Sequence, residues 1–250
     1  GLTIEGADAS DCRRQHLEST PAAEDSGDWL YPHINDENEW LKNYGAAIYV
    51  ENADQVTVRN CRVRNGQNGL GLDRVTDSKV YDNDFSFLSG WGVALWRSNK
   101  NVISRNAVDF CVRGYSHNIY NRGQDSAGIL MFEQCCDNVL AENSATHGGD
   151  GFFGFAGREA LGEAPAPQAD FDYRHRGNNH NLLIKNDFSY APAHGIELTF
   201  SFGNQLIANR LVGNAICGVW GGYSQDTLIA GNEIEDNGEM GYGLECGGVN

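Results

Sequence analysis

An asparagine recurs along the chain at a nearly constant spacing, and this repeat limits the possible fold more than any other feature. It occupies positions Asn60, Asn83, Asn106, Asn143, Asn186, Asn209 and Asn232. Four of the six steps are 23 residues, and the other two, 37 and 43 residues, are one repeat plus an insertion. Each asparagine ends a short aliphatic run such as QVTVRN, NVISRN or NLLIKN, which is typical of a strand. The period is too short for a helical repeat, so we expect stacked short strands.

A second strand in most repeats begins with glycine. These glycines are Gly69, Gly92, Gly128, Gly151, Gly195, Gly218 and Gly241. The first copy, residues 46–50, lacks a glycine in this register. One repeat cannot bury its apolar face alone, whereas copies stacked at about 4.8 Å per coil can. The sequence therefore predicts one all-β domain over residues 1–250, a solenoid of about eight coils of about 23 residues each.

This V-x-x-N and G-x-x-x pattern resembles the repeat of pectate-lyase-like and NosD-like carbohydrate-binding proteins, over roughly residues 46–245. The resemblance implies a right-handed parallel β-helix, a polysaccharide or oligosaccharide partner and a secreted or periplasmic location. The NTD, DD and GHG motifs of polygalacturonases and the DPHD motif of alginate epimerases are absent. The resemblance thus implies a carbohydrate-active protein without naming its reaction. We expect the recurring asparagines to adopt the left-handed conformation, with their amides stacked from coil to coil.

Charge and hydropathy limit the kinds of partner that the protein is expected to bind. The net charge of −16 argues against nucleic-acid binding, which needs clustered lysine and arginine. There is no run of about 18 apolar residues, so no membrane partner is expected. The acidity makes calcium the candidate metal ion, although the sequence contains no EF-hand or nonapeptide calcium motif and leaves the metal ligands unknown. Long irregular loops on one side favour a cleft on a monomer over a trimer.

Three insertions interrupt the repeat, at about residues 7–44, 114–127 and 158–179. The first two enter just before a glycine-led strand, and the third leaves just after one. If the coils lie in register, all three flank the same sheet and form walls beside it. Function on a regular scaffold is concentrated in such interruptions.

Alternation along the glycine-led strands predicts which residues point outward. An aromatic group is expected on this outer face, where it either stacks on sugar rings or is buried by the insertions: Trp96, Phe132, Phe153, Phe155 and Trp220. Polar substrate-binding residues are expected in the second and third insertions: Tyr115, His117, Arg122, Arg158 and Arg176.

The catalytic candidates are Asp150, Glu197, His194, His147 and Asp125. Asp150 and His194 each precede a glycine of the repeat, so stacking is expected to bring them into contact. Glycoside hydrolysis by a carboxyl pair, Asp150 with Glu197 or Asp125, is the first hypothesis. A lyase or epimerase is the second, with a histidine or Tyr115 as base and an arginine or calcium as clamp. A noncatalytic glycan-binding or structural module is the third.

Overall fold

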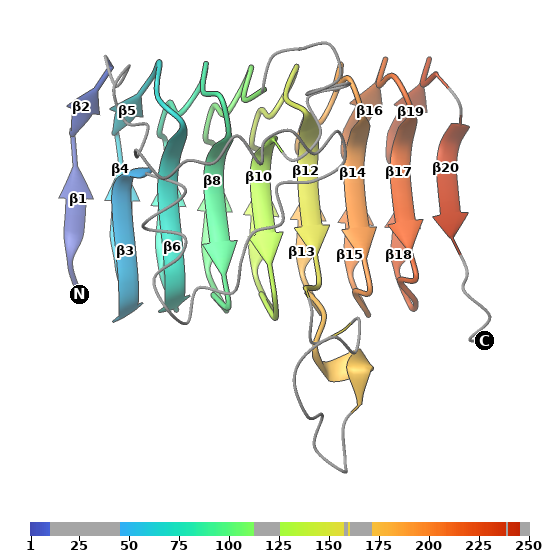
Figure 1. Ribbon diagram of the computed structural model, residues 1–250, viewed down its shortest axis with the longest axis horizontal. Coiled ribbons are helices and arrows are strands. Elements are labelled where there is room, and N and C mark those ends of the chain that lie inside the picture. The colour runs from blue at the N-terminus through green and yellow to red at the C-terminus, as the bar shows by residue number, and fades with distance from the viewer. Residues whose placement is uncertain (11–45, 113–125, 158–159, 161–171, 239, 246–250) are drawn as a thin grey trace, which may run out of the picture.

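The computed structural model describes residues 1–10, 46–112, 126–157, 160, 172–238 and 240–245. Its strands lie side by side in the order of the chain, from β1 at one end to β20 at the other (Figure 1). Nearly every strand pairs in parallel with its counterpart one coil away, so the predicted parallel β-helix is confirmed. None of the described helices is long and apolar enough to cross a membrane.

Sheet 1 is formed by the strands that end just before the repeating asparagine. It has eight strands, β1 (Thr3–Glu5), β4 (Thr57–Arg59), β7 (Lys79–Tyr81), β9 (Val102–Ser104), β11 (Val139–Ala141), β13 (Leu182–Ile184), β15 (Gln205–Ile207) and β18 (Leu228–Ala230). In each strand the central residue points to the core, as Ile103 and Leu140 do, while its two neighbours point away.

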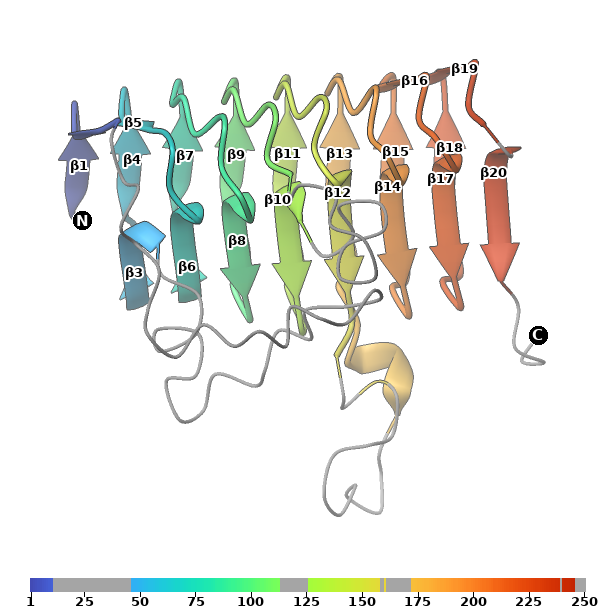
Figure 2. The same ribbon diagram turned by 45° about the horizontal axis from the view of Figure 1, so that its top comes forward.

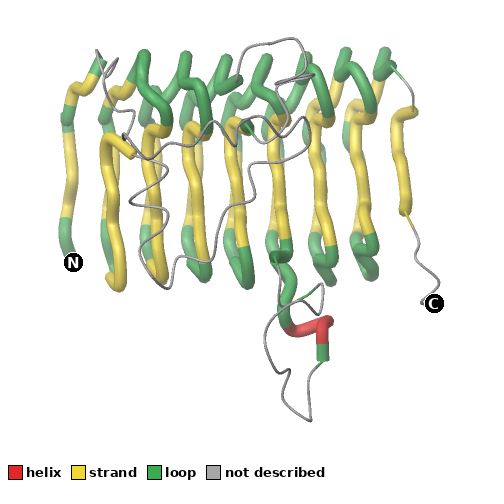
Figure 3. Tube along the Cα trace, viewed as in Figure 1, coloured by secondary structure: helices red, strands yellow, loops and turns green. Residues whose placement is uncertain are grey.

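Sheet 2 is formed by the glycine-containing strands, which run in the opposite direction to those of sheet 1 (Figure 1). Figure 3 shows loops and turns, in green, that connect the strands at both edges of the solenoid. It also has eight strands, β3 (Ala46–Asp54), β6 (Asn68–Thr76), β8 (Trp91–Trp96), β10 (Ala127–Phe132), β12 (Asp150–Phe155), β14 (His194–Thr199), β17 (Cys217–Gly222) and β20 (Met240–Glu245). All six residues of β8, β10 and β12 are buried, so sheet 2 is covered on both faces at its centre.

Two short strand pairs lie along one edge of the solenoid, where Figure 2 turns them toward the viewer. They are β2 (Asp8–Ala9) with β5 (Arg62–Val63), and β16 (Arg210–Val212) with β19 (Glu233–Glu235). A 3₁₀ turn, η3 (Tyr173–His175), lies beyond the end of β12, at the opposite edge (Figure 1). Of the described cysteines, Cys61, Cys111, Cys135 and Cys217 are buried.

The repeating asparagines form the predicted column of stacked amides inside the solenoid. Asn143 is representative: its Nδ2 donates to Oδ1 of Asn186 and to the Ile103 carbonyl, both at 2.9 Å. Its Oδ1 accepts from both the backbone N–H and the Nδ2 of Asn106, at 3.0 Å. The column satisfies polar groups that would otherwise be buried without partners, and it fixes the register of the coils.

Two details of the prediction are wrong. From Asn83 onward the left-handed conformation falls on the residue before the asparagine, such as Arg105 (φ 53°) and Glu142 (φ 56°), whereas Asn60 is itself left-handed (φ 52°). The turn needs a positive φ there, whereas the asparagine itself turns its amide inward. Asn60 is also not in the column: it is exposed, and the Cys61 backbone N–H donates to Asn83 Oδ1 at 2.9 Å instead.

The repeated glycine lies at a bend where two successive residues face inward. A Cβ atom added to Gly151 would lie 2.6 Å from the Gly195 carbonyl oxygen and 2.7 Å from Cβ of Phe188, a core residue. The next residue, Phe152, also points into the core. The residue before the glycine consequently points to the outer face of sheet 2. The second residue after the glycine points to the same face.

Candidate active site

Three titratable side chains meet on the outer face of sheet 2, on the neighbouring strands β12 and β14. Asp150 is the residue before the Gly151 bend, His194 holds the same place before Gly195, and Glu197 lies two residues beyond Gly195. Because the glycine bend turns His194 outward, His194 and Glu197 share a face although they are three residues apart. The predicted contact between Asp150 and His194 is confirmed.

His194 lies between the two carboxylates. Its Nδ1 is 3.2 Å from Asp150 Oδ1 and 3.0 Å from Glu197 Oε2. Its backbone N–H also donates to Asp150 Oδ1, at 2.8 Å. One ligand-type atom from each of the three residues lies within 4.8 Å of the others. We call Asp150, His194 and Glu197 the carboxylate–histidine cluster.

The cluster is partly shielded from solvent, and this shapes its electrostatics. The side chains of His194 and Glu197 are 12% and 15% exposed, and that of Asp150 only 3%. Burial by itself lowers the pKa of the His194 imidazole, but the hydrogen bonds and charges of Asp150 and then Glu197 outweigh it and raise that pKa to about 10. With no other cation bound at Nδ1, His194 therefore carries a proton at neutral pH.

Trp220 completes the surroundings of the cluster. It lies on β17, directly opposite Glu197 in the strand register, and its indole is 5.7 Å from the His194 ring. It is half-buried and packs on Ala193, Ile216 and Cys217. On the other side of Glu197, the register places Phe153 of β12. Aromatic rings therefore lie on both sides of the carboxylate.

The other four aromatic residues predicted on this face point outward as expected, but they are not a solvated strip. Trp96, Phe132, Phe153 and Phe155 are at most 4% exposed and form a second apolar cluster with Trp91 and Leu130. The rings pack on one another across coils, as Phe132 does on Phe155 at 5.5 Å. Trp96 is held between the guanidinium groups of Arg74 and Arg97, at 4.1 and 4.4 Å from its ring. Such packing removes large rings from water, which an alternation pattern does not anticipate.

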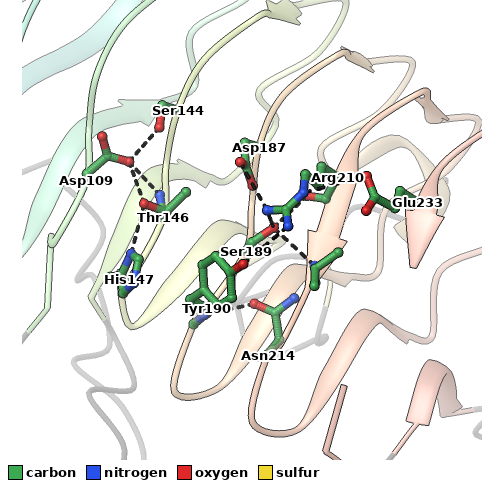
Figure 4. A network of polar contacts seen from close by, with 12 residues as sticks. Asp109, Ser144, Thr146, His147, Asp187, Ser189, Tyr190, Arg210, Asn214 and Glu233 are labelled. Carbon is green, nitrogen blue, oxygen red and sulfur yellow. Dashed lines mark hydrogen bonds and ion pairs between the residues drawn. The ribbon is translucent and has the colours of Figure 1, made fainter. Parts of the chain in front are cut away.

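His147 lies in a different row of the solenoid, and within the described part of the chain its ring contacts Thr146, Phe110 and Tyr190 rather than the cluster. Its exposed ring stacks on Phe110 at 4.6 Å and on Tyr190 at 5.1 Å, and Phe110 stacks in turn on Phe87. Figure 4 shows His147 beside Thr146, whose hydroxyl is 3.0 Å from its Nδ1. The rings face one another along the solenoid axis, so their faces are used within the stack. We assign His147 a structural place, which differs from the predicted catalytic one.

The remaining predicted site residues are mostly outside the described part of the chain. These are Asp125, Tyr115, His117, Arg122 and Arg158. Arg176 is described, and it lies past the end of β12, next to η3. Asp150 begins that strand of six residues, so about 16 Å of strand separates the two edges. The described residues do show that the first two insertions enter sheet 2 ahead of β3 and β10 and that the third leaves it after β12, as predicted.

Sequence reasoning missed a second group of charged residues on the same face. Asp73 and Glu133 are fully buried, and each pairs with an arginine: Asp73 with Arg74 at 3.0 Å, and Glu133 with Arg97 at 3.1 Å. Alternation along β6 gives Asp73 the outer face, but it does not give the pairing with Arg74. A charged residue at the same place in three successive coils, Arg74, Arg97 and Glu133, was the available signal. The pairs hold the indole of Trp96, so we read them as supports of the apolar cluster.

We compared the chain with curated proteins and with solved structures. Comparison with curated proteins gave no significant match. A double mutant of the periplasmic alginate epimerase AlgG superposes with a TM-score of 0.60, at 17% identity, over 80% of this chain and 46% of that one. DFA-IIIase from Arthrobacter chlorophenolicus A6, without its lid, superposes with a TM-score of 0.56, at 10% identity, over 81% of this chain and 48% of that one. The chain thus spans about half the length of these structures, and what it shares with them is the fold.

The family model described as "Right handed beta helix region" matches residues 35–161. This match covers half of the chain, and it includes strands of both sheets from β3 to β12. The handedness predicted from the repeat is thereby confirmed. The chain belongs to the right-handed β-helix family.

Proposed function

We propose that this protein is a carbohydrate-active enzyme that acts on an oligosaccharide or polysaccharide at the outer face of sheet 2. The observation that carries the proposal is the pairing of two carboxylates through one imidazole, beside the half-buried ring of Trp220. Sugar rings stack on aromatic faces, and carboxylates and imidazoles are the usual proton-transfer groups. A DFA-IIIase on a similar fold has been solved in complex with DFA-III, which supports a carbohydrate ligand.

Glycoside hydrolysis is the reaction that this arrangement favours. Oxygens of Asp150 and Glu197 lie within 4.8 Å of each other, closer than the carboxyl separation of about 6.5–9.5 Å in inverting enzymes. The arrangement is nearer to the separation of about 5–5.5 Å in retaining enzymes. A single imidazolium pairs with both carboxylates, so the transferable proton of this group belongs to His194 rather than to a carboxylic acid.

The roles follow from exposure and contacts. Glu197 is the more exposed carboxylate and adjoins Trp220, so we assign it the attack on the anomeric carbon. His194 gives its proton to the departing glycosidic oxygen, and the bond from that oxygen to the anomeric carbon breaks. Water then cleaves the glycosyl ester on Glu197, and its proton returns to His194. Asp150, nearly buried and bonded twice to His194, positions the imidazole.

Elimination or epimerisation is disfavoured by the same contacts. Both reactions begin when a base removes a proton next to a uronate carboxyl group. His194 retains its own proton at neutral pH, because the two carboxylates raise its pKa to about 10.

We further propose a location outside the cytoplasm, which is supported by the periplasmic origin of the AlgG neighbour.

A glycan screen tests the proposal. The full chain is incubated with neutral, amino-sugar and uronate polysaccharides, and products are followed both as reducing ends and as absorbance near 235 nm. We expect reducing ends without new absorbance, and at least about a 10³-fold lower kcat for Glu197→Gln. His147→Gln, outside the cluster, serves as the matched control with wild-type turnover. New absorbance would identify elimination, and glycan binding without any product would identify a binding module; either result contradicts hydrolysis.

A further inference from the structure

The carboxylate–histidine cluster also has the composition of a metal site. Imidazole nitrogen and carboxylate oxygen are the protein ligands of zinc and its first-row neighbours, and catalytic zinc sites use three such ligands with one position open. Asp150, His194 and Glu197 are three ligands of this kind, and each directs one ligand atom into a space less than 4.8 Å across.

The two separations that involve the His194 nitrogen are close to those that a tetrahedral ion imposes. Zinc binds histidine nitrogen and carboxylate oxygen at about 2.0–2.2 Å, which places neighbouring ligand atoms about 3.4 Å apart. Nδ1 of His194 is 3.2 Å from Asp150 Oδ1 and 3.0 Å from Glu197 Oε2. A movement of a few tenths of an ångström would therefore admit an ion.

A proton on His194 Nδ1 does not satisfy both carboxylates. Nδ1 carries one hydrogen, but two carboxylate oxygens face it at hydrogen-bonding distance, so one hydrogen must serve two acceptors. A divalent cation in its place bonds all three atoms at once. It also brings the summed charge of the ion, two carboxylates and a neutral imidazole to zero, which favours a site that is largely buried.

The surroundings hold the ligands in place. Asp150 Oδ1 already accepts the backbone N–H of His194 at 2.8 Å, which orients the carboxylate toward the imidazole. The centroid of the Trp220 ring lies 5.7 Å from that of the His194 ring, on the neighbouring strand β17. Ligands fixed by such supports keep a site ready for an ion.

We propose that Asp150, His194 and Glu197 bind one divalent transition-metal ion, with zinc as the best fit, in place of the proton on His194 Nδ1. Calcium fits less well, because it takes six to eight oxygen ligands and this group supplies a nitrogen. The inference uses the same residues as the proposed function, but it requires no glycan and is tested without one. The hydrolytic roles described above belong to the metal-free protein, because the ion takes the place of the proton that His194 donates there.

Cobalt and zinc titrations of the full chain test this inference. The protein is freed of metal with a chelator and titrated with Co²⁺, whose d–d absorption reports tetrahedral coordination, and with Zn²⁺ by calorimetry. We expect one site per chain, a d–d band above 500 nm and a higher Tm with zinc. Calcium at the same concentration should not displace cobalt.

Variants separate this site from the many surface carboxylates of an acidic protein. His194→Gln and Glu197→Gln should each weaken zinc binding by about 100-fold or more and abolish the d–d band. His147→Gln should leave both unchanged, and circular dichroism verifies that each variant is folded. Should the folded wild type give no d–d band, or should the two cluster variants bind zinc as tightly as the wild type, the inference is overturned.

The outcome is separable from that of the glycan screen. Metal binding without turnover of any glycan supports the metal site and contradicts the proposed function. Full glycan turnover by the metal-free protein, with no cobalt bound at the cluster, supports the proposed function and contradicts the metal site.

Discussion

Asp150 Oδ1 accepts two hydrogen bonds from His194, one from the backbone N–H at 2.8 Å and one from the ring at 3.2 Å. The two residues are 44 positions apart in the chain, and the stacking of β12 on β14 joins them. This contact couples the repeat to the chemistry: whatever fixes the register of the coils also fixes the distance between carboxylate and imidazole.

The stability of the metal-free protein should depend on pH through His194. Asp150 on β12 and Glu197 on β14 both pair with this imidazole, so its pKa is raised from 6.5 in the unfolded chain to about 10 in the folded protein. The folded state then binds the proton more tightly, and this stabilisation is complete below about pH 6.5 and is lost as pH rises toward 10. Urea unfolding at several pH values measures it. His194→Gln should flatten that part of the profile, and an unchanged slope in this variant would count against the contact.

Asn143→Ala should destabilise the solenoid strongly. The substitution removes the amide that bonds Asn186 and the Ile103 carbonyl, and it leaves the Asn106 N–H groups without their acceptor. Buried groups left without partners cost about 1–3 kcal/mol each, so we expect a loss of roughly 3 kcal/mol in the free energy of unfolding. Urea unfolding gives the value. Asn60→Ala, at the exposed asparagine outside the column, is the control and should cost about 1 kcal/mol or less.

Gly151→Ala should disrupt the bend that presents Asp150. The new methyl group would lie 2.6 Å from the Gly195 carbonyl oxygen, which belongs to the backbone and cannot rotate away. Overpacking of this kind costs about 1–3 kcal/mol, and it should also lower turnover because it displaces Asp150 from His194. Gly6→Ala is the comparison: a Cβ there meets nothing within 4 Å, and its φ of +67° accounts for a cost of about 1 kcal/mol. Equal thermal stability of the two variants would argue against a close-packed bend.

His147→Ala should reduce stability and leave turnover intact. The ring is stacked between Phe110 and Tyr190, and it lies in a different row from the carboxylate–histidine cluster. Loss of two ring contacts should cost about 1 kcal/mol. Thermal melts and glycan turnover are measured on the same preparation. A large fall in kcat with unchanged Tm would return His147 to the active site.

Much of the fold can be predicted from the sequence, because the repeat is short and each coil places the same residue types at the same positions. The spacing of the asparagines gives the coil length, and the glycines mark where sheet 2 begins. The conformation of the turn is harder to predict, because the type of the left-handed residue varies from coil to coil: it is Arg105 in one coil and Glu142 in the next. The displaced first asparagine, Asn60, was indistinguishable from the others by spacing alone.

The candidate site was predictable to the extent that it follows from stacking. Asp150, His194 and Glu197 were found from their places around the glycine bend. The burial of Trp96 and Phe132 was one of two alternatives, and the sequence could not decide between them, because alternation gives the face on which a side chain lies and not what packs over it. The pairing of Asp73 with Arg74 was missed because adjacent residues of a regular strand point to opposite faces, whereas Arg74 has a positive φ of 52° and meets its neighbour.

The titration of His194 in the metal-free protein tests the central contact most directly. ¹⁵N NMR of the imidazole nitrogens, assigned by comparison with His194→Gln, follows the ring from pH 5 to the alkaline limit of stability. Two carboxylates around Nδ1 predict an imidazolium that persists through neutral pH, with a pKa of about 10. A ring that loses its proton near pH 6.5, the ordinary value for histidine, would mean that Asp150 and Glu197 do not hold it, and both the proposed reaction and the metal site would lose their basis.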